Sequence, residues 1–136
     1  MKHLLLSALP LLLFTACGKD EQDPVSPPAN TSVTTPEGLW SLMRFEGGFV
    51  PIVEFSNEVY WSVTDGQILV MIADGTTIPV GLPLGANGAY SYEQPSASSM
   101  SLNGLVYTMA VTDTSLVLEY NLAADGMRLT FVPGTP

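Results

Sequence analysis

The chain has 136 residues, of which 46% are hydrophobic, and a formal net charge of −9 at pH 7. So acidic a chain is repelled by nucleic acid and by anionic lipid surfaces, which excludes a nucleic-acid-binding role. Its length is enough for one domain with one core in addition to an N-terminal segment.

The first sixteen residues have the organisation of a secretory signal peptide. A short positive start, Met1 to His3, is followed by eleven apolar or small residues from Leu4 to Phe14 and then by Thr15-Ala16. A helix that spans the hydrocarbon core needs roughly 20 apolar residues, so this run is too short. We expect residues 1–16 to direct export and to be removed.

The only cysteine follows directly after the two small residues. The segment Phe14-Thr15-Ala16-Cys17 resembles a bacterial lipobox, in which the cysteine is acylated and becomes the new N-terminus. The resemblance implies that acyl chains such as palmitate on Cys17 anchor the protein to a membrane; two chains anchor stably where one is marginal. The alternative is an ordinary signal peptide with an incidental cysteine, but a lone exported cysteine has no disulfide partner.

The residues after Cys17 indicate where in the cell the protein is located. Gly18, in place of an aspartate, is similar to the pattern that sorts lipoproteins to the outer membrane, and Lys19, Asp20 and Glu21 resemble an export signal that sends some lipoproteins to the cell surface. The resemblance implies a surface-exposed outer-membrane lipoprotein. A periplasm-facing location, with the charged cluster acting only as a solvated linker, is the alternative.

A tether is expected over residues 17–36. Residues 18–36 contain four prolines, several Ser and Thr, and valine as the only branched aliphatic residue, so they cannot bury enough surface to fold. The folded domain is then expected over residues 37–136.

Apolar segments alternate with turn residues throughout the expected domain. Five dipeptides suit the positive φ of tight hairpin turns: Asp65-Gly66, Asp74-Gly75, Asn87-Gly88, Asn103-Gly104 and Asp125-Gly126. The segments between the turns are rich in β-branched and aromatic residues, which predicts strands near 39–45, 49–55, 58–64, 67–73, 89–93, 99–102 with 105–111, 115–120 and 127–132. The stretch VEFSNEVYWSV, from Val53 to Val63, is expected to be a hairpin.

The strand pattern predicts an all-β, antiparallel domain. Closure removes the two exposed edges that a flat sheet would have, so we expect a small up-and-down barrel of about eight strands, with a β-sandwich as the runner-up. ILVMIA, from Ile68 to Ala73, is apolar on both faces. Its second face is expected to be covered by the loop around Ile78-Pro79-Val80, by a partner or by a ligand.

The head of the first strand, Gly38-Leu39-Trp40, resembles the G-x-W signature of lipocalins. The order of LWSLMRF, GAYSYE, LNGLVYTMAVTDTSLVLEY and ADGMRLTFV is similar to that of short lipocalin-like domains of bacterial lipoproteins. The resemblance implies that Gly38, Trp40 and Arg128 close one end of the barrel, with the guanidinium packed on the indole. Such a contact is worth about 0.5–2 kcal/mol. The alternative is a core Trp40 and an exposed Arg128.

Several kinds of catalytic side chain are missing from the expected mature domain. His3 leaves with the signal peptide, Cys17 is acylated, and Lys19 is the last lysine. This excludes Ser-His and Cys-His catalysis, Schiff-base chemistry and zinc sites built on His or Cys. We expect no enzyme, no cofactor and no metal site, with a carboxylate-based glycosidase as a weak third function because Glu54, Glu58, Glu93 and Glu119 form no motif.

Aromatic side chains are the remaining candidates for ligand contacts: Tyr60, Trp61, Tyr90, Tyr92, Tyr107 and Tyr120. Core packing is their more frequent role in a small domain. Two functions stay open: a non-catalytic binding lipoprotein for a small apolar molecule or glycan, and a structural or accessory protein-interaction module of an outer-membrane complex. A large interior cavity favours the first and a packed interior the second; we expect a packed interior with at most a shallow pocket near the rim.

Overall fold

The computed structural model describes residues 35–135. Within this range lie nine strands and one short 3-10 helix: β1 (Gly38–Gly47), β2 (Val50–Glu54), β3 (Val59–Thr64), β4 (Gln67–Ile72), β5 (Gly88–Ser96), β6 (Ser99–Leu102), β7 (Leu105–Val111), β8 (Leu116–Tyr120), η1 (Leu122–Ala124) and β9 (Met127–Pro133). The predicted signal peptide, Cys17 and the Lys19-Asp20-Glu21 cluster lie outside the described residues. No helix in the described range is long and apolar enough to cross a membrane.

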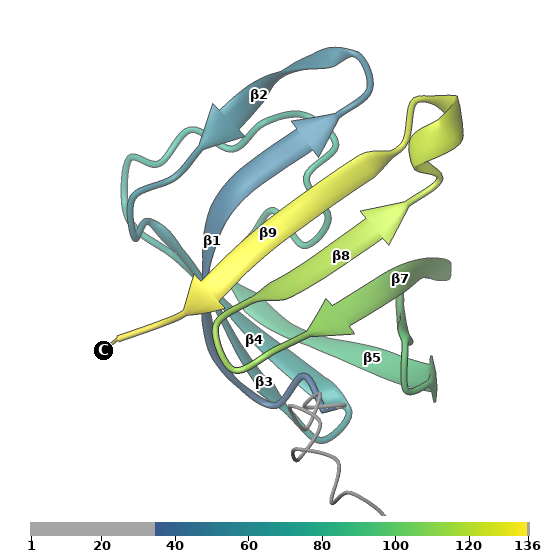
Figure 1. The fold of residues 1–136 in the computed structure, drawn as a ribbon. Helices are drawn as coiled ribbons and strands as arrows, with labels where there is room; N and C mark the ends of the chain where they lie inside the picture. Colours follow the sequence, from purple (N-terminus) through teal and green to yellow (C-terminus); the bar gives the residue numbers. More distant parts are fainter. Residues whose placement is uncertain (1–34, 136) are drawn as a thin grey trace, which may run out of the picture.

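Eight of the strands close into an antiparallel barrel (Figure 1). β3 to β9 pair in sequence order, and β1 completes the ring by pairing with β3 on one side and with β9 on the other. This confirms the expected up-and-down barrel of about eight strands rather than the sandwich. β2 is the ninth strand and pairs with β1 alone.

The expected hairpin from Val53 to Val63 is wrong. β3 pairs with the first half of β1, where Trp40 faces Trp61, whereas β2 pairs with its second half, where Arg44 faces Glu54. β2 and β3 therefore follow one another along the same side of β1 instead of pairing with each other. Ser56 and Asn57 form a break between the two strands. Asn57 has a φ of 65°, and its Oδ1 accepts a hydrogen bond from the Ser41 hydroxyl at 3.3 Å.

Only two of the five predicted turn dipeptides join two-residue hairpins. Asp65-Gly66 connects β3 to β4, and Asn103-Gly104 connects β6 to β7 with φ values of 50° and 80°, as the tight turn requires. Asp74-Gly75 lies inside the long loop 73–87, and Asp125-Gly126 follows η1 in the β8–β9 connection. Asn87, directly before β5, instead bonds to the end of β4 through its side chain: its Oδ1 accepts a hydrogen bond from the Ile72 N–H at 2.5 Å.

Large side chains fill the barrel interior. The indole of Trp61 is fully buried and packs on Phe131, with ring centroids 4.7 Å apart. Every strand of the barrel contributes to the same core, which includes Leu42, Phe45, Val59, Ile68, Val70, Tyr92, Met100, Leu102, Tyr107, Met109, Leu116, Leu118 and Leu129. The alternation of apolar and polar residues along the strands therefore places the apolar set inside, as expected.

The long β4–β5 loop closes the barrel end at which β1 finishes. Leu82 and Leu84 of this loop are buried in the core, and Ile78 packs against it. Leu84 has a φ of 55°, an unfavourable conformation for a bulky residue, which the burial of its side chain offsets. The interior is thus closed by the loop as well as by the walls.

Trp40 closes the opposite end, where β1 begins. Its Nε1 donates a hydrogen bond to the Pro36 carbonyl at 2.7 Å, and both residues are buried. Gly38, with a φ of +140°, lies against the same indole. Pro36, which the sequence placed at the end of the tether, therefore belongs to the folded domain.

The outer face of β4 remains open. Leu69 and Met71 are 47% and 39% exposed, although the other face of the strand is buried. The expectation that residues 78–80 cover this face is wrong, because the loop turns over the barrel end and buries Ile78 against the core instead. A partner or a ligand remains as the expected cover.

The closing role of the loop predicts unequal effects of two truncations within it. Leu82→Ala removes a buried side chain and should lower the free energy of unfolding by about 2–5 kcal/mol. Val80→Ala, at a position 86% exposed, should change it by less than about 0.5 kcal/mol. Urea unfolding followed by tryptophan fluorescence measures both; equal midpoints for the two variants would contradict the closing role.

Candidate functional site

The six aromatic side chains considered as ligand contacts do not form one site. Trp61 and Tyr107 are fully buried in the core, and Tyr92 is buried on β5. Tyr90 and Tyr120 pack against the core from its edge, whereas Tyr60 lies on the outer face opposite Met71. Five of the six therefore serve packing, and of these Tyr92 also borders an open surface depression of about 300 Å³ together with Glu93, Ser101 and Asn103.

The buried phenols are held in their neutral form. Burial is the main cause that raises the pKa of Tyr107, and the Tyr107 hydroxyl donates to the Met127 Sδ at 3.6 Å. Burial also raises the pKa of Tyr92, against a smaller lowering by a backbone hydrogen bond to Gly66. Neither hydroxyl is ionised at neutral pH, so both act as polar ends of packed rings.

The predicted contact between Trp40 and Arg128 is wrong. The register of β1 and β9 places Trp40 opposite Pro133 and Arg128 opposite Glu46. Arg128 lies five positions before Pro133, a distance of about 17 Å along β9. The guanidinium instead bonds to carboxylates: Nε lies 2.8 Å from Glu119 Oε1, and a terminal nitrogen lies 3.5 Å from Glu46 Oε2.

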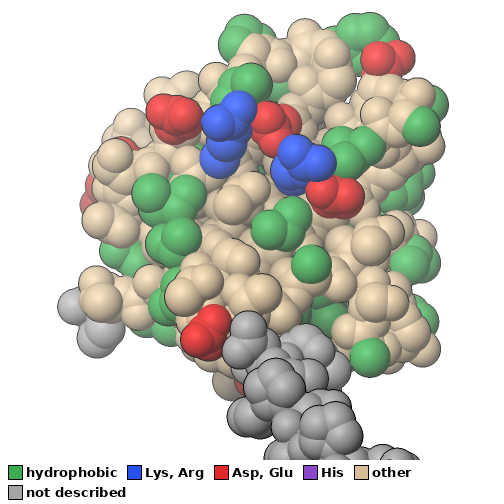
Figure 2. Space-filling model, in the orientation of Figure 1, with side chains coloured by type: hydrophobic (Ala, Val, Ile, Leu, Met, Phe, Trp, Pro, Cys, Tyr) green, Lys and Arg blue, Asp and Glu red, His purple; other side chains and the backbone are tan. Residues whose placement is uncertain are grey.

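Both arginines of the described residues lie in one charged row on the outer surface. Arg44 pairs with Glu46 at 3.0 Å, and Glu46 also faces Arg128. Figure 2 shows the two basic side chains flanked by acidic ones on this face. Both arginines are therefore paired with carboxylates. Because residues 35–135 contain no other Lys, Arg or His, the remaining charged side chains of the described surface are acidic.

The carboxylates do not gather into a metal site. Among residues 35–135, no three side chains of the His, Cys, Asp and Glu types are arranged to hold a metal ion. Glu58 accepts a hydrogen bond from the Ser56 N–H, which ties this carboxylate to the break between β2 and β3.

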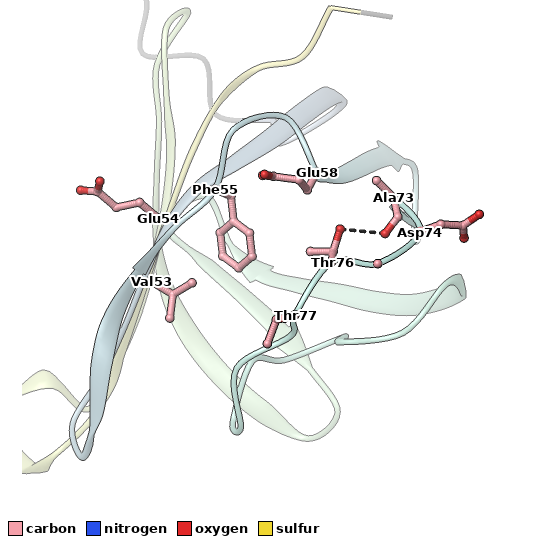
Figure 3. A pocket seen from close by; sticks show the side chains of 9 residues that line it. Val53, Glu54, Phe55, Glu58, Ala73, Asp74, Thr76 and Thr77 are labelled. Carbon is pink, nitrogen blue, oxygen red and sulfur yellow. Dashed lines mark hydrogen bonds between the residues drawn. The ribbon is translucent and has the colours of Figure 1, made fainter.

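A depression lies between β2 and the long loop. Its volume is about 390 Å³, and it is lined by Val53, Glu54, Phe55, Glu58 and residues 73–77. Figure 3 shows Phe55 in the space between the strand and the loop, with Glu54 on the other side of the strand. We call this depression the β2 groove.

A smaller apolar depression of about 170 Å³ lies at the rim, where the β1–β2 turn meets the loop. Phe45, Val50, Val80 and Met127 are among its lining residues, and Phe49 and Val80 are 87% and 86% exposed. Pockets that enclose small molecules usually measure about 300–1,000 Å³, so this rim depression can hold a side chain rather than a whole ligand.

A second open apolar surface lies on β3 and β4. Tyr60 is opposite Met71, and Leu69 is opposite Ala89 of β5, all on the outside. The C-terminal end covers part of this surface, because a Cβ on Gly134 would lie 2.9 Å from Leu39 Cγ and 3.2 Å from Tyr60 Cδ1. Leu69 and Met71 are left exposed, and we call them the β4 face.

Sequence reasoning missed the β2 groove. The misread hairpin assigned β2 a partner strand that it does not have, and so concealed its open side. The available signal was Gly47-Gly48, a better place for the hairpin turn than Ser56-Asn57, combined with Pro51, a residue typical of edge strands.

No protein-family model matches the chain, and a search of curated proteins finds no match. Among solved structures, a crystal structure of an uncharacterized protein from Bacteroides eggerthii DSM 20697 is similar, with a TM-score of 0.48 and 11% sequence identity. The similarity covers 72% of this chain and 98% of that chain.

Proposed function

We propose that this protein is a lipid-anchored, non-catalytic interaction module that binds a partner protein on the outside of its barrel. The filled interior is the observation that carries the proposal. Trp61, Phe131 and Tyr107 occupy the space that a carrier would keep for its ligand, and the loop closes the end with Leu82 and Leu84. An eight-stranded barrel has room either for such side chains or for one small ligand.

The outer surface supports the same function. Leu69 and Met71 on the β4 face, and Phe49 and Val80 at the rim, are exposed apolar side chains. Exposed apolar patches mark interaction surfaces, and Met and aromatic residues are enriched there. The rim and the β2 groove lie at the barrel end opposite Trp40 and Pro36, where the chain enters the domain. A membrane anchor at Cys17, on the other side of a tether, would leave these surfaces free for a partner.

The interior can be tested with the two tryptophans of the chain, Trp40 and Trp61. Titration of the mature protein with long-chain fatty acids, haem-like macrocycles and oligosaccharides should leave their fluorescence unquenched at micromolar ligand, because Trp61 is fully buried among core side chains. A Trp40→Phe variant, which isolates the Trp61 signal, is the control. Sub-micromolar binding of a long acyl chain with strong Trp61 quenching would instead establish a carrier.

The anchor is tested by replacing the cysteine. Cys17→Ser protein should leave the membrane pellet on cell fractionation, since it cannot be acylated, and should lack the acyl mass. Ser32→Ala, a substitution elsewhere in the tether, should fractionate as the wild type does. The lipoprotein assignment fails if Cys17→Ser protein stays in the pellet with an unchanged N-terminal mass.

Surface export is tested by protease treatment of intact cells. Replacing Lys19, Asp20 and Glu21 together with alanine should protect the domain from external protease, if these residues form the export signal. Alanine at Gln22, Asp23 and Pro24 serves as the matched control and should leave the domain accessible. Equal digestion of both variants would remove the cluster from the account.

A further inference from the structure

β2 is the one strand among the described residues that has a neighbour on a single side. The N–H of Phe55, directly after the strand, donates to the Met43 carbonyl of β1 at 2.9 Å. Backbone groups alternate in direction along a strand, so the N–H and C=O of Glu54 point to the open side. The open edge thus offers a donor and an acceptor to a further strand.

The two faces of β2 differ in chemistry near this open edge. Phe55 is buried and Val53 packs against the core, so the inward face is apolar. Glu54 is on the outward face, and its side chain is 76% exposed. Residues directly opposite on neighbouring strands interact on the same face, so a complementary strand alternates apolar and basic side chains.

The β2 groove provides room for such a strand beside the open edge. Its volume of about 390 Å³ lies between Val53 to Phe55 and the loop residues 73–77. Figure 3 shows the loop set apart from β2 across this space. An inward apolar side chain of an added strand would enter the groove, while a basic one would stay outside, next to Glu54.

Charge identifies the occupant among the segments that could pair with β2. Asp74 and Glu58 line the groove together with Glu54, and the nearest arginine, Arg44, lies 3.9 Å from Glu54 but 3.0 Å from Glu46. A second copy of this acidic chain would place like charges together. Residues 17–34 carry three acids against Lys19, so they too are a poor match.

We propose that β2 binds an extended segment of a partner protein by strand addition, and that this segment alternates apolar residues with lysine or arginine. The inference rests on the proposed function, since it names the partner chemistry of that outer surface. Main-chain hydrogen bonds to β2 supply affinity, and the Glu54 carboxylate supplies the preference for a basic residue.

The test uses the full mature lipoprotein in a nonionic detergent and a short synthetic peptide that alternates lysine and valine. Fluorescence anisotropy should detect binding of this peptide, and amide hydrogen exchange of Glu54 should slow when it is bound. A peptide that alternates glutamate and valine should not bind. A lysine-valine peptide with N-methylated backbone amides, which keeps its charge but cannot form a strand ladder, should also fail to bind.

Two substitutions at one position separate charge from the strand edge. Glu54→Gln keeps the N–H and should weaken binding about two- to fivefold, as expected for one exposed ion pair. Glu54→Pro removes the N–H as well and should weaken binding more than about tenfold, with the fold checked by circular dichroism. Glu93→Gln, at an exposed glutamate on β5, should have no effect.

The outcomes distinguish this inference from the proposed function. Strand addition is overturned if the N-methylated peptide binds as well as its parent, or if the Glu54 amide exchanges equally fast with and without peptide. Binding of the lysine-valine peptide on the β4 face alone overturns the β2 site but leaves an outer-surface interaction module. Insertion of a ligand beside Trp61 would contradict the proposed function itself.

Discussion

The pairing of β1 with three other strands is the constraint on which the rest of the structure depends. One side of β1 pairs along most of its length with β9, which closes the barrel. The other side is shared: β3 takes the first half and β2 the second. Because β1 is longer than β3, closure of the barrel leaves β2 outside the ring, with an open edge. The same pairing therefore produces both the enclosed core and the exposed strand.

The enclosed core decides where function can reside. Different residues close the two ends of the barrel. Trp40 and Pro36 close the end where β1 begins, and the loop that carries Leu82 and Leu84 closes the end where β1 finishes. Burial of these side chains stabilises a domain of this size, but it uses the volume that a carrier would leave empty. Recognition is then left to the outside, where apolar side chains on β4 and the open edge of β2 are available and the surrounding charge is acidic.

Local sequence patterns predicted most of the fold. The errors concern features that depend on residues far apart in the sequence. Alternation identified the barrel strands because each of them has one buried face, as in β7, where Tyr107, Met109 and Val111 point inward. The errors concern strand register and loop placement. The contact between Arg128 and Trp40 followed from the resemblance to lipocalins, but the register sets Glu46 opposite Arg128, and register depends on residues distant in sequence. The role of the loop over residues 73–87 depends likewise on the shape of the barrel end.

The candidate site was less predictable than the fold. Core packing was correctly expected as the more frequent role of the aromatic residues. Residue type alone, however, does not indicate which of them faces outward, as Tyr60 does. No sequence motif marks the β2 groove, because the groove is the space between β2 and the loop. The loop leaves the sheet after Ala73, whose N–H donates to the Glu58 carbonyl. An open strand edge is a property of topology rather than of any residue type, so it emerges only when the strand order is known.

The most direct measurement is hydrogen exchange at the Trp61 indole by NMR. The Nε1–H of Trp61 is buried and has no hydrogen-bond partner among the described residues. If the barrel is closed at both ends and filled, this proton should exchange as slowly as the backbone amides of β8 and β9, in the absence of any ligand. Rapid exchange of the indole proton, with those amides still protected, would reveal a water-accessible interior and contradict the account.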